Sequence, residues 1–250
     1  MTKNQLITLL ILLSVIAVSW LYLFYQHWQM TSLPMSEMWM PPAEASTWQW
    51  LDFWLVYVMW AVMMAAMMLP SAIPMILVYA RICAQRYHRH YPYTLIFALS
   101  YLLVWLLFSI ALTVLQWQLH GLKFLSPMMD VEQQMMAAFI FLLAGIYQFT
   151  PLKSSFLGAC RTPMGFLLTE WREGAHGAFI MGLKHGGDCI GCCWAQMLIM
   201  FAVGVMSLIG MALITLLICL EKILPVNQHI LSKAIGILFI LWSFRLFLLE

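Results

Sequence analysis

The chain has 250 residues, of which 64% are hydrophobic and only 9% carry a charge. Soluble globular proteins are only about 45–50% apolar, so the composition excludes a soluble globule and predicts a polytopic membrane protein. Its length allows about six or seven transmembrane helices of roughly 20 residues. We therefore expect an all-α helix bundle in which residues 1–250 form one integral membrane domain. The net charge of +2 gives no reason to expect a nucleic-acid partner.

The first apolar segment, from about Leu6 to Tyr25, is interpreted as a membrane anchor with a cytoplasmic amino terminus. A cleaved signal peptide is the alternative, because Ala17 to Ser19 is an acceptable cleavage site. The apolar run is longer than the apolar h-region of an ordinary signal peptide, which favours the anchor. The next segment carries Glu37 and Glu44 without any Lys or Arg, which predicts a non-cytoplasmic loop.

Three more apolar segments follow, at about 50–79, 94–115 and 135–150. Basic residues cluster after the first and the third of them, and the positive-inside rule places such clusters in the cytoplasm. These residues are Arg81, Arg86, His88, Arg89 and His90, and then Lys153, Arg161 and Arg172. The pattern predicts a multi-pass membrane protein with both clusters in the cytoplasm.

Residues 190–220 carry no charge, and as one straight helix these 31 positions would span about 46 Å. A hydrocarbon core is only about 30 Å thick. We expect either one tilted helix or two helices broken near 204–210, followed by a last helix at about 229–248. The two-helix alternative puts the carboxyl terminus outside, and the single helix puts it inside.

Metal-binding side chains gather at the start of this uncharged stretch, where His185, Asp188, Cys189, Cys192 and Cys193 lie within nine positions. In a helix, Cys189 and Cys192 would lie within about 40° of His185, and Gln196 and Met200 would continue that face. Three nearby glycines favour a loop before the helix as the alternative. Thiolates and thioethers select Cu(I), while a mixture of His and Cys also suits zinc. Copper is therefore the expected metal and zinc the alternative.

Two other interpretations of the cysteines are open. Buried thiols often serve as small apolar packing groups. The Cys-x-x-Cys spacing of Cys189 and Cys192 also fits a thiol–disulfide oxidoreductase, although the predicted non-cytoplasmic loops at 26–49 and 116–134 contain no second pair. Cys160 is expected on the same side of the membrane and would add a further thiolate.

A methionine stripe marks the segment at 50–79, where Asp52, Met59, Met63 and Met67 share one helical face. Thioethers are soft Cu(I) ligands, so this stripe predicts a relay or second metal site. Core packing is the alternative for the methionines, and an interfacial position is the alternative for Asp52. Pro70 and Pro74 should kink the helix and free backbone carbonyls. We expect this helix, the one at 135–150 and the cysteine-bearing helix to meet at the bundle centre.

Several blocks of the sequence resemble an uncharacterised bacterial family described as predicted metal-binding integral membrane proteins. The most specific block is the run from Cys189 to Trp194, and the methionine and proline block at 65–75 is the next. The others are 147–153 with Cys160 and Arg161, His185 and Gly186, 204–206, and Glu221 with Lys222. The resemblance implies a location in the bacterial inner membrane and a metal, without an established reaction.

The function that these features favour is to hold copper inside the bundle, or to hand it on to a membrane or periplasmic partner protein. One alternative is a membrane-embedded copper-dependent oxidoreductase acting on an apolar substrate. A catalytic copper centre usually has several histidines, and here only His185, with His176 at some distance, is near the cysteines. The thiol–disulfide oxidoreductase is the other alternative.

Overall fold

The computed structural model describes residues 3–32, 42, 45–87, 91–122, 124–125, 134–224 and 228–248. These residues form nine α-helices and one short 3-10 helix, which confirms the predicted all-α fold. The elements are α1 (Lys3–Ser32), η2 (Ala45–Thr47), α2 (Trp50–Arg86), α3 (Tyr91–Gly121), α4 (Gln134–Tyr147), α5 (Pro151–Arg161), α6 (Pro163–Glu170), α7 (Gly174–Val203), α8 (Leu208–Ile223) and α9 (Gln228–Leu248).

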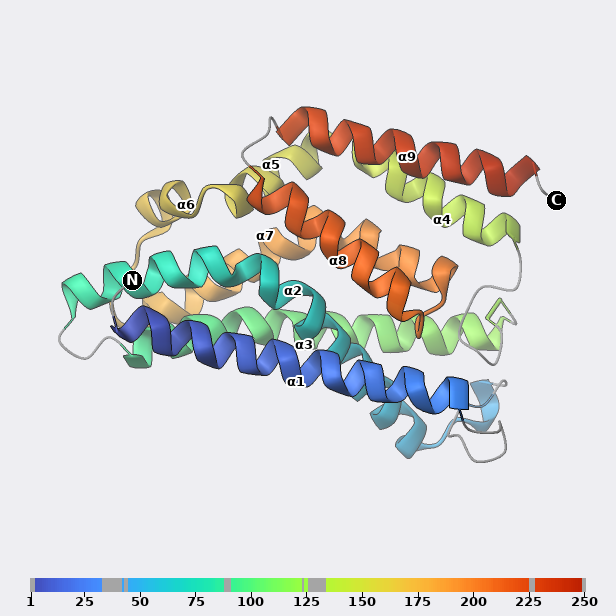
Figure 1. Cartoon of the computed structure of the whole chain (residues 1–250), viewed down its shortest axis with the longest axis horizontal. Helices are drawn as coiled ribbons and strands as arrows, with labels where there is room; N and C mark the ends of the chain where they lie inside the picture. Colours follow the sequence, from blue (N-terminus) through green and yellow to red (C-terminus); the bar gives the residue numbers. More distant parts are fainter. Residues whose placement is uncertain are drawn as a thin grey trace.

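Five of the described helices are long and apolar enough to cross a membrane, namely α1, α2, α3, α7 and α9. A sixth crossing results if α4 and α5, which meet at an angle of 68°, are counted as one broken span. The long helices share one general direction, and the two termini lie at opposite ends of the bundle (Figure 1). The protein is therefore a multi-pass membrane protein.

Helix α2 shows how the prolines shape the bundle. Pro70 has no backbone N–H, so the carbonyl oxygen of Ala66 loses its helical partner. The indole Nε1 of Trp20 in α1 donates to that oxygen at 3.2 Å, and α2 changes direction along its length (Figure 1). The freed carbonyl thus helps to fasten α1 against α2.

The uncharged stretch at 190–220 forms two helices, as one of the two sequence alternatives predicted. Helix α7 ends at Val203, and Gly204 follows with φ of 98°, a conformation that glycine adopts without steric cost. The hydroxyl oxygen of Ser207 then accepts the backbone N–H of Gly210 at 3.2 Å and caps α8. The break lies within the predicted 204–210 range.

Helix α7 continues without interruption through the three glycines near the cysteines, so the loop alternative is wrong. Gly186 faces Val104 of α3, and Gly191 faces the ring of Phe156 in α5. A side chain at either position would collide with that neighbour. Small residues allow close helix packing in membranes, and this packing outweighs the low helix propensity of glycine.

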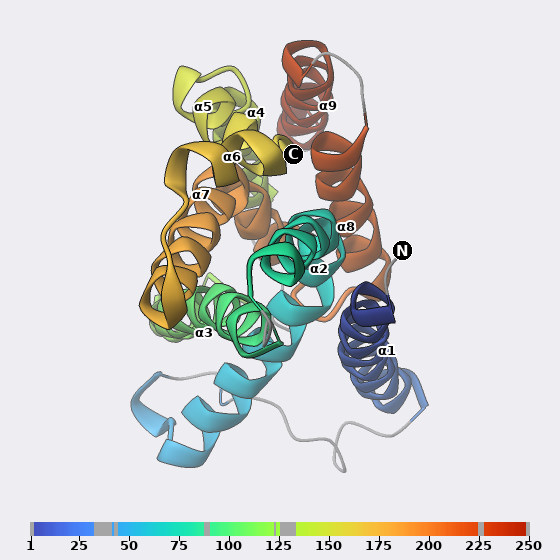
Figure 2. The same ribbon diagram turned by 90° about the vertical axis from the view of Figure 1, so that its left-hand side faces the viewer.

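The helices that surround the centre differ from the prediction. Helix α2 lies between α3 and α8, while α4, α5 and α9 gather at one edge (Figure 2). Helix α4 packs on α9 and α7, where Gly145 and Gly236 let the backbones approach closely. The expectation that α4 meets α2 at the centre is therefore wrong, because its small-residue face packs on α9.

The two basic segments lie at the same end of the bundle. The guanidinium of Arg86 is 3.8 Å from the carboxylate of Glu173 and lies over the ring of Trp171, 4.6 Å from its centroid. The segment after α4 is the helix pair α5 and α6 and not a loop. The predicted acidic loop with Glu37 and Glu44, and the residues His88 to His90, lie outside the described residues.

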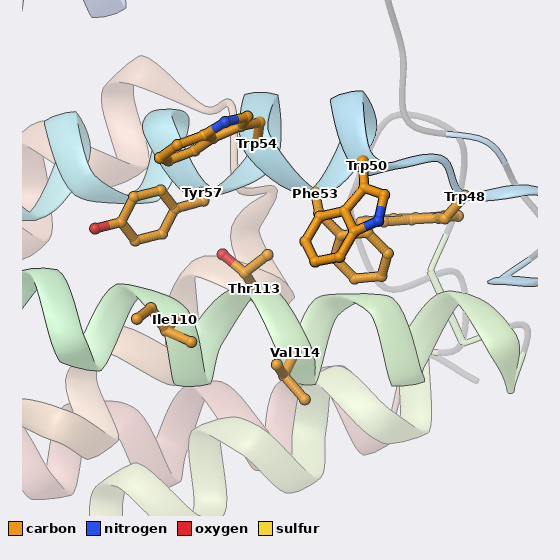
Figure 3. Close-up of a pocket in the computed structure, with 8 residues that line it drawn as sticks. All are labelled: Trp48, Trp50, Phe53, Trp54, Tyr57, Ile110, Thr113 and Val114. Carbon is orange, nitrogen blue, oxygen red and sulfur yellow. The ribbon is translucent and has the colours of Figure 1, made fainter.

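An aromatic surface cavity of about 650 Å³ lies between the first turns of α2 and the last turns of α3 (Figure 3). Its lining residues include Trp48, Trp50, Trp54 and Tyr57. The side chain of Trp50 is 88% exposed. Tryptophan and tyrosine concentrate at membrane interfaces, so this feature fits an interfacial belt.

Candidate metal centre

Three cysteine thiols converge between α5 and α7. The Sγ atoms of Cys160, Cys189 and Cys192 all lie within 4.8 Å of one another. Cys189 and Cys192 share a face of α7 because they are three residues apart, and the packing of α5 against α7 adds Cys160. The Cys160 and Cys192 sulfurs are 3.9 Å apart. All three side chains are buried, which places a group of soft donors inside the bundle.

Cys189 has two polar neighbours that come from other helices. The Nζ of Lys222 in α8 lies 2.8 Å from its Sγ and 3.2 Å from the hydroxyl of Ser71. The hydroxyl of Tyr101 in α3 lies 3.2 Å from the same sulfur. A buried ammonium is costly unless it is paired, so Lys222 supplies a positive charge that thiolates at this place would balance.

Cys193 points to a different neighbour. Its Sγ donates to the Cys189 carbonyl at 2.8 Å and lies 3.8 Å from the Sδ of Met68 in α2. This pair of soft atoms adjoins the three-thiol group without joining it. Met59, Met63 and Met67 are also buried in α2, at most 2% exposed. The described contacts thus connect Met68, which lies outside the predicted stripe, to the cysteines.

His185 lies one helical turn before Cys189 and is 3% exposed. Its ring packs among Phe97, Tyr101 and Phe166, with centroid separations of 6.1, 5.5 and 5.6 Å. Its Nδ1 has no hydrogen-bond partner among the described residues. The imidazole is therefore next to the thiol group but outside the set of atoms within 4.8 Å.

The two predicted carboxylates do not join the thiol group. Asp188 is only half-buried, one turn beyond the exposed Lys184, which forms an ion pair with Glu170. Asp52 lies in the first turn of α2, where its Oδ2 accepts the backbone N–H of Gln49 at 2.8 Å. Asp52 thus has a helix-capping role at the end of the bundle.

A buried ionic network lies one turn beyond Cys192, at Gln196. The Lys153 Nζ donates to the Glu221 carboxylate at 2.8 Å and to the Gln196 amide oxygen at 3.4 Å. The Gln196 Nε2 and the Ser232 hydroxyl each donate to Glu221 at 3.1 Å. Lys153 is 1% exposed, so its charge is neutralised by Glu221 inside the bundle.

The sequence reasoning assigned no role to Lys222 or Glu221. The available signal was a pair of opposite charges immediately after 31 uncharged positions, because ionisable residues at membrane depth usually face the protein interior. In the structure, Glu221 joins the ionic network and Lys222 contacts the thiol group. The end of α8 therefore connects the ionic network with the thiol group.

The donor set fits a soft metal ion. Thiolates and thioethers favour Cu(I), whereas Mg²⁺ and Ca²⁺ require oxygen ligands. Zinc also binds thiolates but takes four ligands in structural sites, and among the His, Cys, Asp and Glu side chains of the described residues this group has three donor atoms within 4.8 Å of one another. The chemistry of the site thus agrees best with copper.

The fold and the site together define a multi-pass membrane protein with a buried group of soft metal ligands. Residues 57–246 match the family model PpoB2, which is described as copper chaperone. The match covers well over half of the chain, which therefore belongs to this copper chaperone family. The matched range includes the three thiols and Lys222, and the family description confirms copper as the expected metal. No curated protein and no solved structure matches the chain.

Proposed function

We propose that the protein binds one Cu(I) ion through the thiols of Cys160, Cys189 and Cys192 and passes it to a partner protein. The convergence of three buried sulfurs within 4.8 Å of one another carries this proposal. Membership in the copper chaperone family supplies the cargo. A chaperone must release its ion, so its ligands need an arrangement that allows exchange.

The charge of the site supports a monovalent ion. Two thiolates, one Cu(I) and the ammonium of Lys222 are electrically neutral together. Neutrality is favoured inside a bundle, because an uncompensated buried charge costs several kcal/mol. The third thiol keeps its proton in this arrangement and is available for exchange. Zn(II) would need a third thiolate to reach the same neutrality.

Further soft donors suggest where the ion moves next. His185 lies one turn from Cys189, and the Cys193 and Met68 sulfurs form a pair 3.8 Å apart beside the thiol group. The buried Met59, Met63 and Met67 extend the sulfur-bearing part of α2 toward its first turn. We propose these residues as a relay through which Cu(I) leaves the thiols.

We further propose that the basic end of the bundle faces the cytoplasm of a bacterium. Arg81, Arg86, Arg161 and Arg172 support this orientation, because cytoplasmic segments are rich in Lys and Arg. The thioether relay would then lead toward the opposite side. The recipient would be a membrane or periplasmic protein with its own soft ligands.

Copper retention tests this proposal. Purified protein in detergent is loaded with Cu(I) under reducing conditions, washed with a chelator and analysed for copper per chain. The natural protein should retain about one copper, and the triple Cys160→Ser, Cys189→Ser, Cys192→Ser variant should retain almost none. The Cys83→Ser, Cys219→Ser variant is the matched control, because both thiols lie outside the group. Equal retention by all three proteins would overturn the proposal.

A further inference from the structure

A second cavity, of about 270 Å³, lies beside the buried ionic network. It lies between the start of α5, which follows α4, and the start of α9. The starts of α5 and α9 are neighbours (Figure 1). Its lining includes Gln148, Thr150, Lys153, Ser232 and Lys233. Unlike the aromatic cavity beside the first turns of α2, this one is lined mostly by polar residues.

The side chain of Gln148 lacks hydrogen-bond partners in this cavity. It is 4% exposed, and neither its Oε1 nor its Nε2 has a partner among the described residues. A buried polar group without a partner costs about 1–3 kcal/mol. A molecule that offers both a donor and an acceptor, such as a peptide group, would satisfy this amide.

The charges around the cavity favour an anion. The first turns of α5 and α9 both border it, and helix amino termini attract negative charge. Lys153 is already neutralised by Glu221, but the exposed Lys233 has no ion-pair partner among the described residues. No Asp or Glu is among the described residues that line the cavity. A bound molecule would therefore carry a negative charge, for which a carboxylate is one suitable group.

The cavity and the thiol group share one helix. Leu157 lines the cavity, and Cys160 follows three residues later, a rise of about 4.5 Å along α5. Gln196, whose amide contacts Lys153, is one turn beyond Cys192 on α7. The cavity and the Cys160 thiol thus lie on adjacent turns of α5.

We propose that this cavity binds a small thiol peptide bearing carboxylates, which delivers Cu(I) to Cys160. This proposal rests on the proposed copper function and adds the chemical class of the donor. In the exchange, the copper–sulfur bond of the carrier breaks and one to Cys160 forms. The proton of the Cys160 thiol moves to the departing carrier thiolate, and copper stays monovalent throughout.

Binding of reduced glutathione to the copper-free protein, measured by equilibrium dialysis, tests recognition. S-methylglutathione, which keeps the carboxylates and peptide groups, should bind equally well, and inorganic phosphate should not compete. Gln148→Leu and Lys233→Gln should each weaken binding about tenfold, as expected for one or two lost hydrogen bonds or one lost charge contact. Arg81→Gln removes an exposed charge elsewhere and should change nothing. Equal binding by all variants, or effective competition by phosphate, would overturn the proposal.

Loading kinetics separate this proposal from the copper function itself. Lys233→Gln should load about tenfold more slowly from Cu(I)–glutathione, in proportion to its weaker binding. It should load at the natural rate from the acetonitrile complex of Cu(I) and reach the same final copper content. Unchanged loading from both sources would contradict the carrier site. Failure of the natural protein to retain copper from either source would instead contradict the proposed function.

Discussion

Replacement of Lys222 by methionine should weaken Cu(I) binding strongly while the fold is kept. The Nζ of Lys222 lies 2.8 Å from the Cys189 sulfur, and the residue is 7% exposed. Without its ammonium, two thiolates and one Cu(I) leave a net negative charge inside the bundle. Loss of one partner of a buried ion pair costs about 3–5 kcal/mol. At about 1.4 kcal/mol per factor of ten, the affinity should fall by at least about 100-fold.

Competition against a chromophoric Cu(I) chelator measures this change. Lys222→Arg, which keeps the charge, should retain more affinity than Lys222→Met. Arg81→Gln is the control for an exposed positive charge and should bind copper as the natural protein does. If Lys222→Met stays within about threefold of the natural affinity while remaining monodisperse, the charge argument is refuted.

Three other perturbations test the site. Gly191→Ala should weaken copper binding, because the new Cβ would lie 2.7 Å from the Phe156 ring and displace α5 from α7. Gly187→Ala meets no atom within 4 Å and should leave chelator competition unchanged. Lys153→Leu should lower the melting temperature, because the buried Glu221 carboxylate loses its partner at a cost of about 3–5 kcal/mol. The double variant Lys153→Leu, Glu221→Leu should recover most of the lost stability. A double variant as unstable as the single one would contradict the role of the ion pair. Copper affinity should fall as the pH falls, by about tenfold per pH unit for each thiol proton released on binding, and a pH-independent affinity between pH 8 and 6 would argue against thiolate ligands.

The spacing within single helices was readable from the sequence. Cys189 and Cys192 share a face of α7 because they are three residues apart. The apolar run was long enough to suggest either one tilted helix or a break near 204–210, and the structure has the break at Gly204. Pro70 predicted a freed carbonyl, and the Ala66 oxygen is bonded to Trp20. Such features depend on neighbours in the chain, so helical geometry alone predicts them.

Helical geometry alone did not predict the contacts between helices. Cys160 reaches the thiol group through the packing of α5 on α7. The sequence suggested it as a further thiolate on the same side of the membrane, but not which thiols it would meet. A helical wheel shows which methionines share a face but not which face meets α7. The sulfur–sulfur contact of Cys193 with Met68, which lies outside the predicted stripe, could therefore not be predicted. The role of Lys222 depends on α8 folding back beside α2 and α7.

X-ray absorption at the copper edge of the reconstituted natural protein tests the central claim most directly. Three buried thiols within 4.8 Å of one another should give a Cu(I) edge and a first coordination shell made only of sulfur. In the triple variant Cys160→Ser, Cys189→Ser, Cys192→Ser this signal should disappear. A shell of nitrogen or oxygen in the natural protein, or a sulfur shell that persists in the variant, would contradict the account.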